Sequence, residues 1–211
     1  MSGAMIIGAG PGIGRSVARR FAAGGMPVAL VSRTGRTLDV AGARGYTADC
    51  ADEDALRAAL DAARADLGVP DVVVYNAALI RPDTTGEATM RAHLDAWAVN
   101  VVGALVAAAH LAPAMAARGG GTFIVTGGMP EPKRQYVSLS LGKSGVRTLV
   151  TLLDQEYGPS GVHVASVTVA GPVAPGTPFD PDDIAEHYWR LHTQPRDRWQ
   201  HEVLHAGRPA A

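Results

Sequence analysis

Four glycines crowd into residues 8–14 (GAGPGIG), directly after the apolar run at residues 4–7. Glycine permits a sharp turn and lets backbone N–H groups approach a bound group closely. Where a helix follows such a turn, its N-terminus favours a pyrophosphate electrostatically. The segment therefore predicts a dinucleotide-binding loop, and the alternative is a tight turn without a ligand. The residues expected to contact the cofactor here are Gly8, Gly12, Ile13 and Gly14.

A second candidate contact lies at the end of the apolar run at residues 28–32. In dinucleotide-binding folds an acid after the second strand binds the ribose of NAD, whereas an arginine accommodates the extra phosphate of NADP. This chain has Ser32 and Arg33 there and no acid. A hydroxyl can bond to a phosphate, and a guanidinium adds a planar charged contact. The pair predicts NADP(H), against the alternative that Arg33 is a solvated loop residue.

Residues 201–205 (HEVLH) match the zinc-protease string His-Glu-x-x-His. Zinc chelation needs that string on a helix, together with a third ligand. We expect residues 199–205 to form a short final strand, on which His201 and His205 would lie about 13 Å apart and could not share a metal. We therefore predict no metal site. The tail holds four of the seven histidines, which favours a surface or subunit contact: His187, His192, His201 and His205.

The hydrophobic pattern predicts the scaffold that must position these residues. Short apolar runs alternate with longer helical patterns, as parallel strands covered on both faces require. The expected strands cover residues 4–7, 28–32, 46–48, 72–75, 122–126 and 162–169, and a late helix opens at Asp180 and runs to about His192. The pattern predicts an α/β fold of the Rossmann type, a doubly wound parallel β-sheet flanked by helices. We expect one domain over residues 1–211, with a ligand crevice at the carboxyl ends of the strands.

Composition excludes several classes of function. The chain has 211 residues, of which 47% are hydrophobic, which suits one domain with a sizeable core. Its 19 Lys and Arg balance 20 Asp and Glu, so we expect no nucleic-acid or membrane partner. The uncharged residues 96–117 are interrupted by Asn100, His110 and Pro113, which favours a helix buried on most sides over a membrane span. Cys50 is the only cysteine and no secretory signal is expected, so we predict the cytoplasm.

Short segments spread from residue 5 to about residue 175 share a further pattern. They are the glycine loop at Gly8, Gly12 and Gly14, residues 75–78 (YNAA), Asn100 in residues 98–100 (AVN), residues 142–146 (GKSGV) and residues 170–173 (AGPV). In type and order they resemble the glycine loop, the Asn-Asn-Ala-Gly strand end, the helix asparagine, the active-site lysine segment and the Pro-Gly-x-Val element of the short-chain dehydrogenase/reductase family. Together these matches are far more specific than any one of them.

The resemblance implies roles for further residues. Asp49 would accept a hydrogen bond from the adenine amine, and Cys50 would be a small apolar contact beside it rather than a nucleophile. Lys143 and Asn100 would position the nicotinamide ribose and a water molecule. The remaining cofactor contacts that the resemblance implies are Asn76, Ala77, Lys143, Gly171 and Val173.

The same resemblance shows which catalytic groups are missing. The family's reaction uses a tyrosine as general acid/base four residues before the lysine, where this chain has Leu139, which cannot transfer a proton. The serine expected after the fifth strand is replaced by Gly127 or Gly128. Residues 184–195 (IAEHYWRLHTQP) resemble the tail of a short branch of the family that has a nonpolar residue at the tyrosine position. The chain is therefore expected to belong to an atypical branch that lacks the usual Ser and Tyr.

Three nearby hydroxyls are candidate substitutes. Tyr136 stands seven residues before Lys143, on the same helical face and about 10.5 Å along an ideal helix, although a capping or core role is the alternative. Ser140 is three residues before Lys143 and within reach of it, but an unactivated hydroxyl is a poor acid. Thr126 could orient a carbonyl if the register shifts. With none of them, Asn100 and Lys143 could hold water as the proton donor.

These observations favour an enzyme, an NADP(H)-dependent oxidoreductase acting on a carbonyl or alcohol group of a small molecule. The alternatives are a non-redox cyclase, isomerase or dehydratase on the same scaffold, and a nucleotide-binding protein without turnover. Residues from about 174 to 211 are expected to form a short substrate-side tail that leaves the pocket open or closed by another subunit. Uncharged, Ala- and Gly-rich faces on the helices of Asn100 and Lys143, the family's usual oligomer surface, predict a homodimer or homotetramer.

Overall fold

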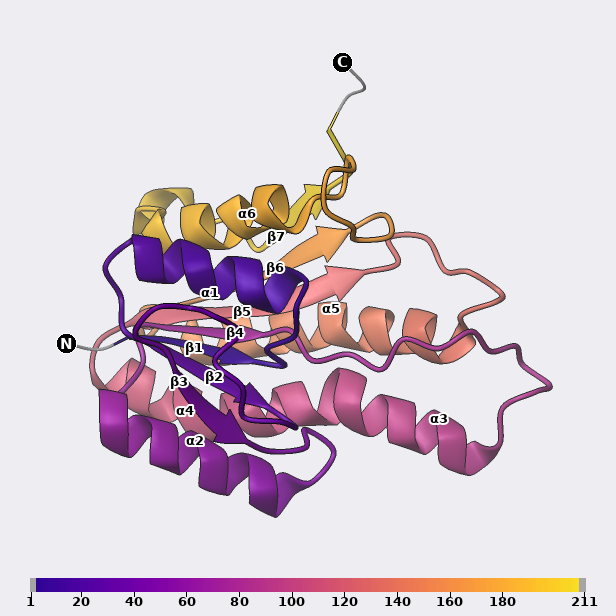
Figure 1. Ribbon diagram of the computed structural model, residues 1–211, viewed down its shortest axis with the longest axis horizontal. Coiled ribbons are helices and arrows are strands. Elements are labelled where there is room, and N and C mark those ends of the chain that lie inside the picture. Colours follow the sequence, from indigo (N-terminus) through magenta and orange to yellow (C-terminus); the bar gives the residue numbers. More distant parts are fainter. Residues whose placement is uncertain (1–2, 209–211) are drawn as a thin grey trace.

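Seven parallel strands form the centre of the structure, a computed structural model that describes residues 3–208. The strands are β1 Ala4–Ile7, β2 Val28–Ser32, β3 Arg44–Thr47, β4 Val72–Tyr75, β5 Gly121–Gly128, β6 Val162–Val169 and β7 Glu202–His205. Their order across the sheet is β3-β2-β1-β4-β5-β6-β7 (Figure 1). The chain reverses its direction of growth between β1 and β4, so a crevice opens where their carboxyl ends diverge. The predicted doubly wound Rossmann sheet is confirmed.

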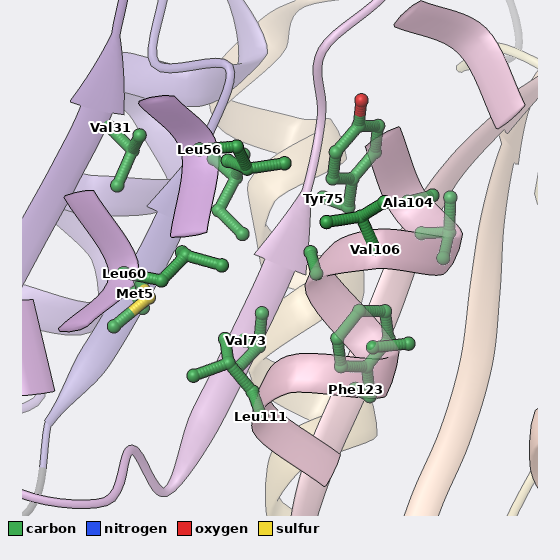
Figure 2. Packing of buried hydrophobic residues seen from close by; sticks show 14 of the residues in the cluster. Met5, Val31, Leu56, Leu60, Val73, Tyr75, Ala104, Val106, Leu111 and Phe123 are labelled. Atoms are coloured by element: carbon green, nitrogen blue, oxygen red, sulfur yellow. The ribbon is translucent and has the colours of Figure 1, made fainter. Parts of the chain in front are cut away.

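Helices cover both faces of the sheet (Figure 1). They are α1 Ile13–Ala23, α2 Glu53–Leu67, α3 Met90–Trp97, α4 Gly103–Ala117, α5 Val137–Tyr157 and α6 Pro181–Thr193, with the π-helical segment η1 Ala98–Val102 and the 3-10 turn η2 Arg196–Arg198. On the face of α2, α4 and α5, Leu60, Leu111 and Phe123 are fully buried (Figure 2). On the face of α1 and α6, Phe21 and Tyr188 are equally buried. The two apolar layers fix which helix approaches each strand end.

Polar side chains cap the first turns of α2 and α6. The Asp52 carboxylate accepts from the Ala55 N–H at 3.0 Å at the start of α2, and two acidic residues follow in its first turn. The Asp180 carboxylate accepts from the Asp182 N–H at 2.9 Å, with Pro181 at the first position of α6. Such caps satisfy N–H groups that have no partner inside the helix.

Three strand boundaries differ from the prediction. The third strand is Arg44–Thr47 rather than residues 46–48, because it is an edge strand whose exposed side chains carry no apolar pattern. The fifth strand continues past Thr126 to Gly128, because β5 pairs with β6 residue by residue as far as Gly128 and Val169. The last strand begins only at Glu202, since the preceding residues form η2 and a connecting turn.

The helical run from Met90 to Ala117 is long and apolar enough to cross a membrane by length and composition alone. Of its most apolar window, 56% is buried inside the domain, because α4 packs against the sheet and against α2 and α5. The core helix of a globular domain passes the same test, so the run confirms the predicted buried helix. Its outer face still exposes Leu94, Trp97 and Leu105.

Candidate functional site

The glycine loop between β1 and α1 is closed on one side and open on the other. Gly8 has φ +83°, and a Cβ there would stand 2.2 Å from the Ala77 backbone nitrogen. Only glycine can occupy this close approach between the ends of β1 and β4. At Gly10 and Gly12, by contrast, no described atom beyond the glycine and its two chain neighbours lies within 4 Å of the position that a Cβ would take. The open side of the loop therefore fits a pyrophosphate approached by backbone N–H groups.

An unpaired cationic group stands beside this loop. The Nε atom of Arg15, two residues into α1, is buried and has no hydrogen-bond partner among the residues that the structure describes. Buried donors are usually satisfied, so an unpaired one next to a helix N-terminus agrees with a site for an anionic group.

The ends of β2 and β3 bring the predicted adenosine contacts together. Ser32 Oγ accepts from the Gly35 N–H at 3.2 Å, and the exposed Arg33 side chain follows it. Asp49 Oδ1 accepts from the Ala51 N–H at 2.9 Å. Burial raises the pKa of the Cys50 thiol to about 11, with charges at Asp49 and Arg33 acting on it as weaker influences. A neutral, buried thiol agrees with the expected apolar contact and not with a nucleophile.

A chain of hydrogen bonds ties three strand ends together. The Asn76 Nδ2 group donates to the Gly8 carbonyl at 3.0 Å, and its Oδ1 accepts from the Thr126 hydroxyl at 2.9 Å. Because Thr126 donates its proton to Asn76, the Tyr188 hydroxyl donates to Thr126 Oγ1 at 2.7 Å. The Asn76 side chain, expected at the cofactor, thus bonds to the protein itself. Tyr188 comes from α6, on the face of the sheet opposite to α5, and burial raises the pKa of its phenol.

Lys143 lies at the carboxyl end of β5 and is buried. Its Nζ donates to the Thr126 carbonyl at 2.6 Å, the one hydrogen bond described for this group. Burial lowers the pKa of Lys143 to about 8. A lysine whose ammonium is desolvated and points to the end of a central strand is a candidate site residue on physical grounds.

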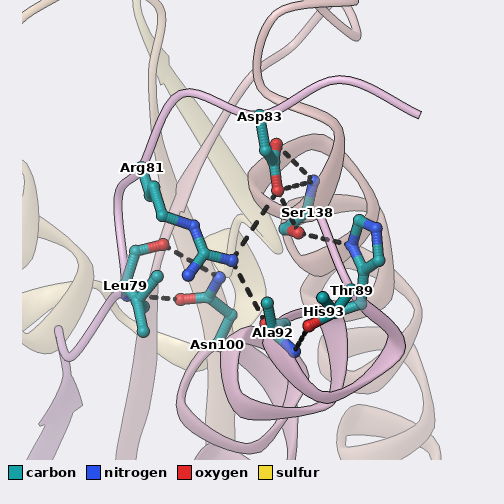
Figure 3. A network of polar contacts seen from close by, with 8 residues as sticks. All are labelled: Leu79, Arg81, Asp83, Thr89, Ala92, His93, Asn100 and Ser138. Carbon is teal, nitrogen blue, oxygen red and sulfur yellow. Dashed lines mark hydrogen bonds and ion pairs between the residues drawn. The ribbon is translucent and has the colours of Figure 1, made fainter. Parts of the chain in front are cut away.

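Asn100 lies in η1 and packs against α5 (Figure 3). A Cβ at Gly142 would stand only 2.8 Å from the Asn100 Cβ. Asn100 therefore packs against the residue of α5 that directly precedes Lys143. Its Oδ1 accepts from the Leu79 N–H at 2.7 Å and its Nδ2 donates to the Leu79 carbonyl at 3.3 Å. Both ends of the side-chain amide therefore fix the segment after β4. That Asn100 holds water beside Lys143 stays a prediction.

The structure distinguishes the two candidate serine positions. A Cβ at Gly127 would stand 2.3 Å from Thr168 Oγ1 on β6, so no side chain fits there. A Cβ at Gly128 would lie 3.6 Å from Lys143 Cε, an ordinary contact distance. Of the two positions, only Gly128 therefore has room for a side chain. Leu139, at the place expected for a tyrosine, is 4% exposed.

Two of the predicted substitute acids have other partners in the structure. Tyr136 does not share a helical face with Lys143, because it precedes α5 with φ −142° and ψ 54° and its backbone pairs with Asp83. Ser140 lies in α5 three residues before Lys143, but its Oγ accepts from the Lys133 N–H at 3.0 Å in the loop before α5. The expectation for Tyr136 assumed that the helix begins earlier than Val137, and helical spacing says nothing of the loop that bonds to Ser140.

A polar network that the sequence did not predict holds the segment after β4 between α3 and α5 (Figure 3). The Ser138 hydroxyl donates to the Asp83 carboxylate, and the Ser138 N–H also donates to it at 3.1 Å. His93 Nδ1 then donates to Ser138 Oγ at 2.7 Å. Burial raises the pKa of Asp83, but the bonds from Ser138 and the nearby His93 and Arg81 bring it below its usual value. Since the serine donates to the carboxylate instead of to the histidine, this is not a nucleophilic triad.

The tail histidines all contact groups of the chain itself, and the expected surface or subunit contact stays a prediction. His192 Nδ1 lies 3.0 Å from Thr122 Oγ1, and His187 Nε2 lies 2.9 Å from His205 Nδ1. His201 pairs instead with Asp154 on α5 at 3.4 Å. His201 precedes β7 and His205 ends it, and the two histidines have different partners. Within residues 3–208, no group of three His, Cys, Asp or Glu side chains could hold a metal ion.

The remaining predicted contacts follow β6. A Cβ at Gly171 would stand 2.3 Å from the Phe179 ring, and Val173 is 38% exposed. Because β6 neighbours β5, these residues lie at the same edge of the sheet as Lys143 and the glycine loop. The parallel sheet thus brings segments from six strand ends to one edge, as the alternating pattern predicted.

Comparisons with known proteins agree with this arrangement. The sequence profile described as "short chain dehydrogenase" matches residues 2–180. A galactitol 2-dehydrogenase (L-tagatose-forming) of Cereibacter sphaeroides is 34% identical over 176 residues, covering 76% of this chain and 67% of that protein. A short-chain dehydrogenase of Rhodopseudomonas palustris superposes with a TM-score of 0.87 at 26% identity, covering 99% of both chains. A metagenomic short-chain oxidoreductase in complex with NADP superposes with a TM-score of 0.85 at 26% identity, covering 96% of this chain and 95% of that one.

Proposed function

Because the chain belongs to the short-chain dehydrogenase family, we propose that it is an NADP(H)-dependent oxidoreductase acting on a carbonyl or alcohol group of a small molecule. The observation that carries the proposal is the glycine loop, open at Gly10 and Gly12, at the same sheet edge as the buried Lys143. Membership of the family supports oxidoreductase chemistry, and the proposal adds the choice of cofactor and the residues that use it.

The described residues fit the cofactor. The loop at Gly8, Gly12, Ile13 and Gly14 would hold the pyrophosphate, and Ser32 with Arg33 would hold the 2′-phosphate of NADP. Adenine would lie beside Asp49 and Cys50, and Ala77, Gly171 and Val173 would approach the nicotinamide half. When bound, the nicotinamide supplies or accepts the hydride. The solved neighbour that contains NADP supports this choice of cofactor.

Lys143 is the group of this chain that acts on the reacting end. Protonated, it can donate to the nicotinamide ribose in addition to the Thr126 carbonyl, since an ammonium has three N–H donors. Leu139 and Gly128 supply no acid and no hydroxyl, so the proton for the substrate oxygen comes from water. We place the chain in a short branch of the family with this reduced set of catalytic residues. Residues from about 174 to 211 would form its substrate-side tail.

Two rival functions follow from the same two positions. Loss of the acid and the hydroxyl at Leu139 and Gly128 also agrees with a non-redox cyclase, isomerase or dehydratase, or with a nucleotide-binding protein without turnover.

The small-molecule partner follows from the relative that acts on galactitol, which favours polyols and ketoses as the substrate class. We further propose that the chain works in the cytoplasm as a homodimer or homotetramer. Its interface would cover the exposed apolar residues of α3, η1, α4 and α5, among them Leu94, Trp97, Leu105, Leu141 and Leu152.

A substrate panel separates these functions. We expect the protein to reduce at least one ketose, L-tagatose among those tested, with one NADPH consumed for each alcohol formed. The measurement follows nucleotide and product together over a series of ketoses and polyols. A product formed without consumption of nucleotide would select the non-redox enzyme, and no product from any of them would select binding without turnover.

A further inference from the structure

A chain of hydrogen bonds links α6, β7 and the loop that follows β6. The Arg190 guanidinium donates to His187 Nδ1 within α6. His187 Nε2 lies 2.9 Å from Nδ1 of His205, the last residue of β7. His205 Nε2 lies 3.0 Å from the Pro178 carbonyl oxygen in the loop. We call these four groups the histidine relay.

The partners at its two ends fix the direction of every bond. A carbonyl oxygen only accepts, so His205 Nε2 carries the proton and its Nδ1 accepts from His187 Nε2. A guanidinium only donates, so His187 Nδ1 accepts from Arg190. Each imidazole therefore carries one proton and is neutral. A second proton on either ring would place two N–H groups opposite each other.

The loop held by the relay is the one that carries the proposed contacts of the nicotinamide half. The Pro178 carbonyl also accepts from the Arg208 N–H at 3.0 Å, so two donors, from His205 and Arg208, hold it in place. The next residue, Phe179, packs edge-on to His205 with ring centroids 5.7 Å apart. The Phe179 ring lies directly over Gly171, where a Cβ would stand 2.3 Å from it. Displacement of Pro178 would therefore shift the surface against which Gly171 rests.

We propose that His187 and His205 are positioning residues for residues 171–180, and that protonation of the relay releases this loop and weakens contact with the nicotinamide half of the cofactor. The inference rests on the proposed function for its ligand, and on the relay geometry for its mechanism.

The charged groups around the relay come from three parts of the fold. Within α6, Arg190 faces His187, and so do Asp183 and Glu186. Arg20 of α1 pairs with Glu186 at 2.6 Å, and Arg208 after β7 pairs with Asp183 at 2.7 Å. Both acids are thus already engaged by arginines.

Protonation of His187 is consequently unfavourable in the folded arrangement. Burial is the largest cause, followed by Arg190 and His205, and they outweigh Asp183 and Glu186, so the pKa of His187 falls from 6.5 to about 4. A released imidazole would recover its ordinary pKa and take up the proton more readily. The relay is therefore fully stable above about pH 6.5 and loses stability as the pH falls toward 4.

The test compares NADPH with adenosine 2′,5′-bisphosphate, which lacks the nicotinamide half, by calorimetry at pH 7.5 and pH 5.0. For the wild type we expect NADPH affinity to fall about tenfold at the lower pH relative to that of the bisphosphate, within an upper bound of about 30-fold from the linkage. In His205→Leu, NADPH affinity relative to that of the bisphosphate should be about tenfold lower at pH 7.5 and at pH 5.0 alike. In the double variant H187Q/H205Q, amides donate and accept in the same direction without taking a proton, so NADPH affinity should no longer depend on pH relative to the bisphosphate.

Hydrogen–deuterium exchange of residues 171–180 gives a readout that needs no cofactor. Protection of this loop should fall in His205→Leu at pH 7.5, and in the wild type between pH 7.5 and 5.0 after correction for intrinsic exchange. His201→Gln is the matched control, since His201 precedes β7 and pairs with Asp154 outside the relay. Equal losses of NADPH and bisphosphate affinity in His205→Leu, or unchanged protection of the loop, would overturn the proposal. If the wild type binds neither ligand, the proposed function fails, while exchange still decides the relay.

Discussion

Introducing a tyrosine at Leu139 and a serine at Gly128 raises the rate of ketose reduction by NADPH about 100-fold or more. A positioned general acid contributes typically about 10²- to 10⁴-fold, and the wild type has no such group four residues before Lys143. Leu139 is already buried, so a ring there replaces apolar volume. A Cβ at Gly128 would lie no closer than 3.6 Å to its nearest neighbour, Lys143 Cε, which is an ordinary contact distance. The measurement is kcat with a fixed ketose and saturating NADPH.

Two control variants isolate the chemistry of this gain. Leu139→Phe with Gly128→Ser adds the same ring without the hydroxyl, and its rate should stay near that of the wild type. Gly127→Ser should destabilise the protein, because its Cβ would stand 2.3 Å from Thr168 Oγ1. A double variant L139Y/G128S that folds, binds NADPH and gains no rate would show that Lys143 does not mark the reacting end of the site.

Replacing Lys143 by methionine makes the protein without cofactor more stable at pH 7, by up to about 3 kcal/mol less the cost of removing the donor to the Thr126 carbonyl. Burial lowers the pKa of Lys143 from 10.5 to about 8, and each pKa unit corresponds to about 1.4 kcal/mol. Methionine has a similar length and carries no charge that must be desolvated. The same substitution removes the ammonium from the ribose, so we expect NADPH affinity to fall at least tenfold. Denaturant unfolding and calorimetry measure the two effects.

The pH dependence gives this prediction its sign. The unfolded chain holds the Lys143 proton up to about pH 10.5, whereas the folded chain releases it near pH 8, so wild-type stability rises across that window. The advantage of Lys143→Met is therefore largest below pH 8 and disappears by about pH 10.5. Lys133, exposed in the loop before α5, is the matched control, and Lys133→Met should change stability little at any pH. Equal stability of wild type and Lys143→Met at pH 7 would contradict the burial argument.

The fold was predictable because its determinants are local. Strands such as β4, with the sequence VVVY, are buried on both faces and therefore apolar throughout. The glycine loop was predictable for the same reason, since Gly8 needs a positive φ and a close approach that glycine alone permits. The edge strand β3 lies in solvent and carries no such pattern, so its boundaries were misplaced.

The catalytic half of the site depends on contacts between distant segments, which spacing along the chain does not encode. Which of Gly127 and Gly128 has room for a side chain is decided by the pairing of β5 with β6, through the position of Thr168. Tyr136 was assigned to a helical face, but its backbone pairs with Asp83, more than fifty residues earlier. The histidine relay also depends on a contact between distant segments, since it joins α6 to the last strand, and no short sequence motif predicts it.

The most direct test of the account is a calorimetric titration of the protein with NADPH and with NADH, repeated on Arg33→Ala and on Arg36→Ala as the matched control. Arg36 is exposed in the same loop but stands outside the strand end. A charged hydrogen bond contributes about 1.5–3 kcal/mol, so Arg33→Ala should weaken NADPH binding about 10- to 100-fold and leave NADH binding unchanged. The account predicts tighter binding of NADPH than of NADH by the wild type, and this selective loss. Binding of neither nucleotide to the wild type would contradict it and leave a dehydrogenase scaffold used for another purpose.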